Sequence, residues 1–545
     1  MSKPIGRSVR GLFVVLLVSS TGWLAFADDS VPLRQRIDDQ IAALADGPLS
    51  PKSTDATFVR RVYLDFAGRI PTVDETRGFL QEADLQKRER LIQQLLDSPA
   101  CARRLRDVFH VMLMERLGDH PEWSQFLERS FAENKAWDQL VREILHPDAD
   151  DEATRGAAFF WTKRLEKYGQ NPVDYPGLTR DVGRLFLGVD MQCAESHDHL
   201  FIDDYRQADF QGLSAFVKHT FIRTDAKFPA VGEKLVTDEV EFASVFVQQP
   251  MTTGPRLPGE PPVSIVRFEK GEEYLMPPDR KTKFPGVPRF SPLSILAEQL
   301  PRRDNSAFSR NSVNRFWFVL FGRGLVEPLD LHHSDNPPSH PELLALMAEQ
   351  FVAHEFDIRW LLKEMALSEA YQRSSRLPSE DAVAPATYRT ALERPLSAEQ
   401  LLASIVIATG QTELAQVACG TEVDDKVRQR YSEQLDRFRA TFANVKRDPE
   451  TDFRPSVKAA LFLMNDDQTL RWFEPHDAST AAQLATLPED TVADELYLRI
   501  LSRPASETER ARVAELFSEH PGNRAAVLGH LVWALTASAE FCLNH

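Results

Sequence analysis

Apolar side chains recur at helical spacing along most of this chain, and this periodicity favours a mainly α fold. Residues 58–66 follow the i, i+3, i+4 pattern, and Gly68 marks the expected end of that helix. Signals for helix starts, as capping boxes, a capping Asp or a first-turn Pro, occur at residues 72–75, 98–99, 339–342, 357 and 506–509. We therefore expect multi-helix domains with a small β insert between the two halves of the chain.

Composition changes along the chain predict five parts. The β insert is expected because EVEFASVFV and VSIVRF alternate in part between polar and apolar residues, with Pro and Gly clustered between them. The parts are a signal peptide at 1–27, an N-terminal helical domain at 28–235, a β and Pro-rich insert and linker at 236–290, a second helical domain at 291–475, and a C-terminal helical subdomain at 476–545.

The N-terminus predicts export. Lys3, Arg7 and Arg10 precede a short apolar run, and the A-x-A sequence at residues 25–27 is typical of a cleavage site. Because the apolar run is too short to span a bilayer, we expect a soluble periplasmic or extracellular protein with no integral membrane segment after cleavage.

The net charge and the spacing of the cysteines argue against a nucleic-acid-binding protein and against a disulfide-stabilised scaffold. The net charge of −17 argues against a nucleic-acid partner, because phosphate binding needs a basic face. The chain has four cysteines, which are too far apart to form a disulfide framework: Cys101, Cys193, Cys419 and Cys542.

The densest group of chemically reactive side chains lies in residues 180–212, RDVGRLFLGVDMQCAESHDHLFIDDYRQADFQG. Cys193 and His197 have the spacing of the Cys-x-x-Cys-His motif for haem c, but Ser196 replaces the second cysteine and cannot form its thioether. A divalent metal held by Cys193, His197, Asp198 and His199 is the second chemistry that fits. The third interpretation is a helix end with a buried cysteine and two solvated histidines.

Other polar side chains are further candidates. Asp198, Asp203 and Asp204 could act as acid and base of a hydrolase on extracellular polymers. Asp65 and Arg69 flank a Gly turn, and they either bind a polar ligand or tie two helices together. A second polar group would bind a metal or an anion, or form a solvated loop with a structural arginine; its members are Asn314, Arg315, Arg323, Asp330, His332, His333, Asp335 and His340.

Several long stretches resemble a known family. RLFLGVDMQCAESHDHLFIDDYRQADFQGLSAF and FVRRVYLDFAGRIPT are similar to the first domain of the planctomycete family of paired domains of unknown function, which is cytochrome c-associated and exported. NSVNRFWFVLFGRGLVEP, NPPSHPELL and SEAYQRSS are similar to its second domain, and the final LVWALTASAEFCLNH resembles the closing helix of the family. The resemblance implies export and a haem or redox link. It also implies a secreted protein partner, because such proteins are often encoded beside an exported sulfatase-like protein.

Three functions are consistent with these observations. The first is a redox protein that binds haem c or a divalent metal at Cys193, His197 and His199. The second is a non-catalytic exported scaffold that partners another secreted protein, and the third is a polymer hydrolase. The chain has no P-loop, no Gly-x-Gly-x-x-Gly, no Gly-x-Ser-x-Gly elbow and no His-Glu-x-x-His sequence, so no short motif names a reaction.

Overall fold

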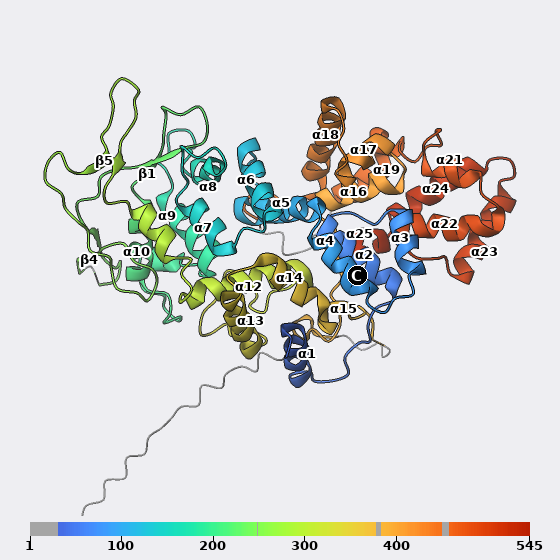
Figure 1. Cartoon of the computed structure of the whole chain (residues 1–545), viewed down its shortest axis with the longest axis horizontal. Helices are drawn as coiled ribbons and strands as arrows, with labels where there is room; N and C mark the ends of the chain where they lie inside the picture. Colours follow the sequence, from blue (N-terminus) through green and yellow to red (C-terminus); the bar gives the residue numbers. More distant parts are fainter. Residues whose placement is uncertain (1–30, 248, 378–382, 449–456) are drawn as a thin grey trace, which may run out of the picture.

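The computed structural model describes residues 31–247, 249–377, 383–448 and 457–545. Helices dominate this part of the chain and the strands are short, so the predicted mainly α fold with a small β insert is confirmed (Figure 1). The predicted signal peptide at 1–27 lies outside the described residues.

The first half of the chain builds one large apolar core from amphipathic helices. Trp123, Trp161, Phe58 and Phe109 are fully buried in it. Its helices are α1 (Leu33–Ala43), α2 (Asp55–Ala67), α3 (Val73–Gln81), α4 (Lys87–Leu96), α5 (Pro99–Met114), α6 (Pro121–Ala132), α7 (Trp137–Leu145), α8 (Phe159–Arg164), α9 (Tyr175–Val182) and α10 (Gln207–Val217).

The next segment forms three separate two-stranded antiparallel sheets. Their strands pair in chain order, as β1 (Thr220–Ile222) with β2 (Val231–Glu233), β3 (Val240–Phe242) with β4 (Met251–Thr253), and β5 (Tyr274–Met276) with β6 (Val287–Pro288). The strand predicted for VSIVRF is wrong: residues 263–268 form no ladder, and the Arg267 guanidinium instead binds the Thr237 carbonyl and Asp238.

The following helices return to the first core. Trp317 and Phe316 of α12 are fully buried there, and the Phe316 ring lies 5.1 Å from the Phe109 ring of α5. These helices are α11 (Pro292–Gln299), α12 (Ser306–Phe321), α13 (Pro341–Ala353), α14 (Ile358–Leu367) and α15 (Glu369–Gln372). Helices on both sides of residue 291 thus share one core, and the predicted domain limits stay predictions.

The last part of the chain has a second apolar core, which also takes Leu64 and Ile70 from the N-terminal region. In Figure 1, α2 and α3 accordingly lie beside α22 and α25. The elements are β7 (Arg394–Pro395), α16 (Ala398–Ala408), α17 (Thr412–Cys419), α18 (Asp425–Phe442), α19 (Val457–Asn465), α20 (Asp467–Leu470), α21 (Thr480–Ala485), α22 (Glu489–Leu501), α23 (Glu507–Glu519), α24 (Arg524–Thr536), α25 (Ala539–Cys542) and β8 (Leu543–Asn544), which pairs with β7.

Most predicted helix starts are confirmed. Thr72 and Ser506 form capping boxes, Ser98 caps α5 ahead of Pro99, and Asp357 caps α14. The capping box predicted at Ser339 is wrong. Its N–H donates to the Leu325 carbonyl, and the helix begins one residue later, with His340 at the N-cap.

None of the helices in the described residues has the length and apolar character needed to cross a membrane. The four cysteines, which all lie in this part of the chain, are free thiols.

Candidate functional site

The helix before Cys193 positions the predicted site. Asp174 caps α9 by accepting the Gly177 N–H at 2.9 Å, and the helix continues into a π turn, Gly183–Leu187. The predicted apolar stripe is buried, with Leu185, Phe186 and Leu187 at most 2% exposed. Gly188 ends the turn with φ +73°, and a β-carbon there would lie 2.6 Å from the His332 ring. The chain can therefore leave the core only because residue 188 is glycine.

The Cys193 motif lies outside this core. Cys193–Glu195 is one 3₁₀ turn in which Ala194 is buried and Cys193 is exposed. The His197 Nδ1 lies 2.6 Å from the Asp198 carbonyl oxygen, so Nδ1 carries the proton and Nε2 has a free lone pair. The His197 ring packs against Phe246, with 4.8 Å between ring centroids.

His199 has the opposite tautomer. Its Nδ1 accepts the N–H groups of Phe201 at 3.2 Å and Ile202 at 3.0 Å, so in the neutral ring the proton is on Nε2. The His199 N–H in turn donates to the Tyr205 carbonyl at 2.9 Å. The ring thus holds residues 199–205 in a compact turn.

The candidate carboxylates mostly bind main-chain groups. Asp198 accepts the Gln207 N–H at 2.8 Å, at the first turn of α10, where a carboxylate is stabilised by the helix dipole. Asp204 accepts the Ser334 N–H at 2.5 Å, and this bond lowers the pKa of Asp204 below its usual value. Asp203 is exposed. Among the described residues, no three or more His, Cys, Asp or Glu side chains lie where they could hold a metal ion together.

The structure brings the two predicted polar groups together. Val189 and Leu331 form an antiparallel bridge, and the His332 N–H donates to the Gly188 carbonyl at 2.9 Å. The Tyr205 hydroxyl donates to the His332 carbonyl at 3.4 Å, and the Tyr205 ring lies 5.5 Å from the His333 ring. We call these contacts between residues 188–205 and 330–334 the seam.

Buried members of the second group hold the chain in place. Asn314 exchanges two hydrogen bonds of 2.9 Å with Val326, and Arg315 donates to the Arg184 carbonyl at 2.6 Å. Burial and, to a smaller extent, the cations Arg315 and Arg310 together lower the pKa of His332 to about 4, so His332 is neutral near pH 7.

The remaining members of that group take no part in a common site. His340 is buried beside the Tyr388 ring, and burial lowers its pKa. The Arg323 carbonyl accepts the Tyr388 hydroxyl at 3.1 Å, whereas Asp335 is exposed.

Asp65 and Arg69 tie separate elements together, as one of their two interpretations predicts. Asp65 accepts hydrogen bonds from Arg394 at 2.8 and 2.9 Å, from the Tyr371 hydroxyl at 2.7 Å and from Asn544 at 2.9 Å. Arg69 forms a two-point ion pair with Glu75 at 2.8 Å. These bonds join α2 to the C-terminal strand and to the start of α3.

Two protein-family models match this chain, and each of them covers one side of the seam. The family model PSCyt2, a protein of unknown function (DUF1549), matches residues 36–221, and PSD1, a protein of unknown function (DUF1553), matches residues 294–517. The chain belongs to the family that pairs these two domains. The predicted resemblance is thereby confirmed. Comparison with curated proteins and with solved structures found no match.

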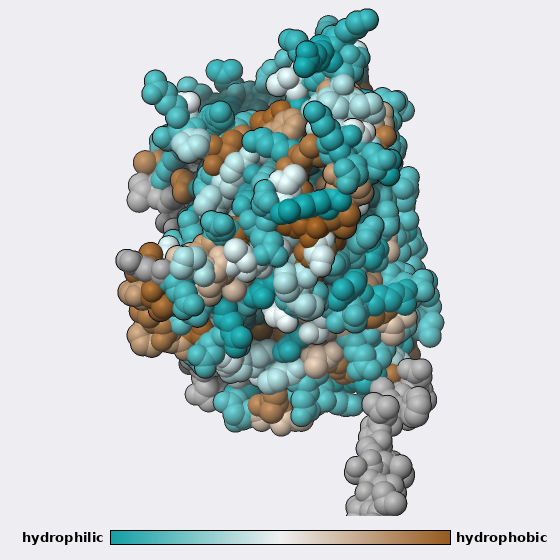
Figure 2. Space-filling view, turned by 90° about the vertical axis from the view of Figure 1, so that its left-hand side faces the viewer, coloured by the Kyte–Doolittle hydropathy of each residue, from teal (hydrophilic) through white to brown (hydrophobic). Residues whose placement is uncertain are grey.

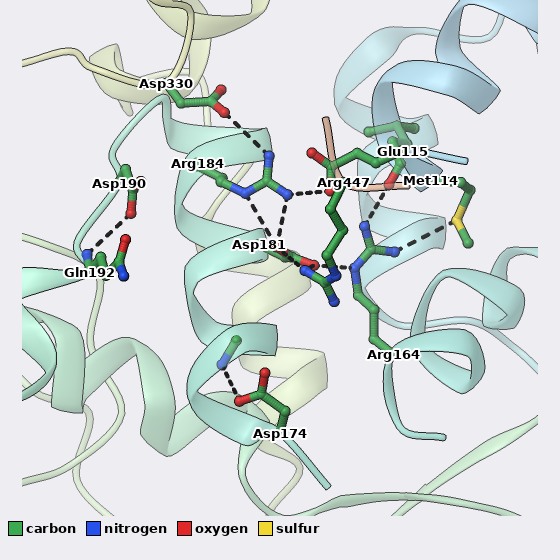
Figure 3. Close-up of polar contacts among 12 residues, drawn as sticks. Met114, Glu115, Arg164, Asp174, Asp181, Arg184, Asp190, Gln192, Asp330 and Arg447 are labelled. Carbon is green, nitrogen blue, oxygen red and sulfur yellow. Dashed lines mark hydrogen bonds and ion pairs between the residues drawn. The ribbon is translucent and has the colours of Figure 1, made fainter. Parts of the chain in front are cut away.

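An ion network centred on the buried Asp181 joins the PSCyt2 and PSD1 domains beside the seam (Figure 3). Asp181 of α9 binds Arg164 at 2.7 Å, Arg184 at 2.8 Å and Arg447 at 3.4 Å. Arg184 also binds Glu115 and, at 3.2 Å, Asp330. Burial alone would raise the pKa of Asp181, but the guanidinium groups of Arg164, Arg184 and Arg447 outweigh it and lower the pKa to about 2.

Sequence reasoning missed Asp181, Arg164 and Arg184 as functional positions. The signal that could have found them is an Asp and an Arg three residues apart beside the apolar stripe of the helix, since a charge among buried positions needs a partner. The partners Asp330 and Arg447 are far away in the sequence, and no local pattern connects them to α9.

A separate hollow of about 440 Å³ lies in the PSD1 domain, between α17, α18 and α20. Glu413 and Arg430 form an ion pair in its lining, and Gln411 donates to His476 at 3.2 Å. None of the residues predicted from the sequence lines this hollow.

Proposed function

We propose that this protein is an exported, non-catalytic scaffold whose two domains present the face around residues 195–251 to a secreted protein partner. The observation that carries the proposal is that polar and apolar side chains at the predicted site have different surroundings. Asp198, His199 and Asp204 bind main-chain groups, whereas the large apolar side chains Phe201 and Phe246 are exposed beside them. Groups that fix a loop and leave apolar side chains in solvent suit binding better than proton transfer.

The hydrolase hypothesis has less support. A glycosidase needs two carboxyl groups about 5 to 9.5 Å apart on either side of a substrate, one of them with a raised pKa. The Asp204 pKa is instead lowered by the Ser334 N–H, and Asp198 stabilises the start of α10.

Cofactor attachment at Cys193 and His197 is the second candidate, and one observation favours it. The His197 Nδ1 binds a carbonyl and leaves Nε2 free, the arrangement that an iron or zinc ligand requires. The residues fit haem c only in part, because Cys193 can form one thioether and Ser196 none. Cys193 and His197 would hold such a haem, and it would supply one-electron transfer.

One experiment separates these functions. The mature protein is exported in a host that matures cytochromes c, and its absorption spectrum and metal content are measured beside those of the Ser196→Cys variant. The scaffold proposal expects neither a Soret band nor stoichiometric metal in the wild type. A Soret band in the wild type that is lost in His197→Ala would replace the scaffold with a redox protein.

A further inference from the structure

Six large apolar side chains are exposed on two neighbouring loops and on the first residue of β4. They are 42% to 82% exposed, and they are Leu200, Phe201, Val245, Phe246, Val247 and Met251. We call this set the apolar patch. Figure 2 views the side of the molecule that carries β1, β4 and β5 in Figure 1, and apolar surface there stands out among hydrophilic side chains. Single exposed apolar residues are ordinary, but a group of them marks an interaction surface.

Two contacts join the two loops into one surface. The Val245 N–H donates to the Ser196 carbonyl at 3.1 Å, and the Phe246 ring packs on His197. Phe201 lies 6.4 Å from the His199 ring, and Met251 pairs with Phe242 across β3 and β4. The patch is therefore anchored to the Cys193 motif on one side and to a sheet on the other.

The segments that carry the patch are strongly acidic. Residues 195–206 and 237–251 together contain seven carboxylates and one arginine. Two of these carboxylates have cationic neighbours, since Glu195 pairs with Arg180 at 3.3 Å and Asp238 with Arg267 at 2.9 Å. Asp203, Glu239 and Glu241 are exposed.

We propose that the apolar patch docks a protein segment that carries large apolar side chains flanked by Lys and Arg. This inference rests on the proposed scaffold function and states the chemistry of the partner. The apolar side chains of the partner would cover Phe201 and Phe246, because desolvated aromatic residues supply most of the energy of an interface. The flanking cations would lie near the exposed carboxylates of Asp203, Glu239 and Glu241. This charge complementarity speeds association and disfavours acidic partners.

The same charges disfavour other occupants. A second copy of the chain would bring carboxylates against carboxylates, and like charges in contact are repulsive. The overall charge of −17 adds to that repulsion at low salt. An anionic lipid surface would be repelled for the same reason.

The probe is a synthetic amphipathic helix with Leu and Phe on one face and Lys and Arg on the other. A matched peptide carries Glu in place of the cations, and the full mature chain is titrated into each labelled peptide while anisotropy is followed. Phe201→Ser with Phe246→Ser removes the two aromatic side chains of the patch. Leu85→Ser is the control variant, because Leu85 is 98% exposed between α3 and α4 and far from the patch in sequence.

The basic peptide is expected to bind the wild type and the Leu85→Ser variant equally, and the double variant about tenfold or more weakly. The Glu peptide is expected not to bind. Equal binding of both peptides, or no effect of the double variant, overturns the inference. So does a concentration-dependent dimer in sedimentation, or binding to anionic vesicles, that the double variant abolishes.

The two proposals fail in different ways. A haem spectrum in the wild type removes the scaffold function, whereas patch-dependent peptide binding would still stand. A protein without cofactor whose peptide binding ignores Phe201 and Phe246 removes the docking surface and leaves the scaffold function open to another face.

Discussion

The two ends of one segment contrast in their chemistry. On α9 and the π turn, the buried Asp181 and the partly buried Arg184 are paired with each other and joined to both domains. A few residues later, Cys193 and Asp203 are exposed on a loop that is held by its own main chain. The rare residue types lie on the loop, and the buried charges lie on the helix before it. In this segment the residue types that stand out in the sequence lie at the surface, whereas the charged residues that hold the two domains together lie on the helix before them.

The largest effect should come from Asp181→Ala. It leaves the buried guanidinium group of Arg164 and the partly buried one of Arg184 without their central carboxylate, and losing one partner of a buried ion pair costs about 3–5 kcal/mol. Urea unfolding of the wild type and the variant measures this loss. Asp203→Ala is the matched control, because an exposed carboxylate should change the free energy of unfolding by less than about 0.5 kcal/mol. Equal effects of the two substitutions would contradict the contrast.

The next effect is a pH dependence at the seam. The folded pKa of His332 is about 4, against 6.5 for the free side chain, so the unfolded chain binds this proton first as the pH falls. The contribution of His332 to the free energy of unfolding is therefore fully present above pH 6.5. It declines as the pH falls toward 4, by about 3 kcal/mol for a shift of this size. His332→Gln should flatten this decline in urea unfolding across that range. His520→Gln, at an exposed histidine, should leave it unchanged.

Gly188→Ala tests the turn that separates the helix from the loop. The substitution places a β-carbon 2.6 Å from the His332 ring at a φ of +73°. Gly169→Ala is the control, since Gly169 has φ +65° and open space around it. Left-handed strain alone costs about 1–2 kcal/mol, and overpacking adds about 1–3 kcal/mol. In urea unfolding, Gly188→Ala should therefore destabilise the protein by about 2 kcal/mol more than Gly169→Ala. An equal loss of stability would mean that His332 moves aside to make room for the β-carbon.

Local sequence signals predicted local structure well. The capping box of Thr72 and Glu75 and the apolar stripe at 185–187 depend on residues within one or two turns, and the structure contains both. Ser339 has the same local pattern but binds the Leu325 carbonyl, a contact that arises from the tertiary fold. The alternating VSIVRF segment likewise lacks a strand partner, because pairing depends on what lies beside it.

The candidate site was predicted less completely than the fold. Cys193, His197 and His199 stood out by residue type, but the tautomers of the two histidines depend on main-chain groups of Asp198 and Phe201, and the His197 ring packs against Phe246. The seam joins Val189 to Leu331 across a long stretch of chain, and one sequence carries no signal for that bridge. What the sequence lacked was the pairing of distant segments.

The smallest expected effect is on the loop itself, and it tests the contrast from the other side. Cys193→Ser changes an exposed thiol that follows the buried core, so the free energy of unfolding should change by less than about 0.5 kcal/mol. Cys101→Ser is the matched variant, since Cys101 is 2% exposed within the first core and burial raises its thiol pKa. A buried hydroxyl without a designed partner costs about 1–3 kcal/mol, so Cys101→Ser should shift the urea midpoint and Cys193→Ser should not. If Cys193→Ser also shifts it, the loop contributes to the stability of the core, and the exposed cysteine has a structural role that its surroundings do not explain.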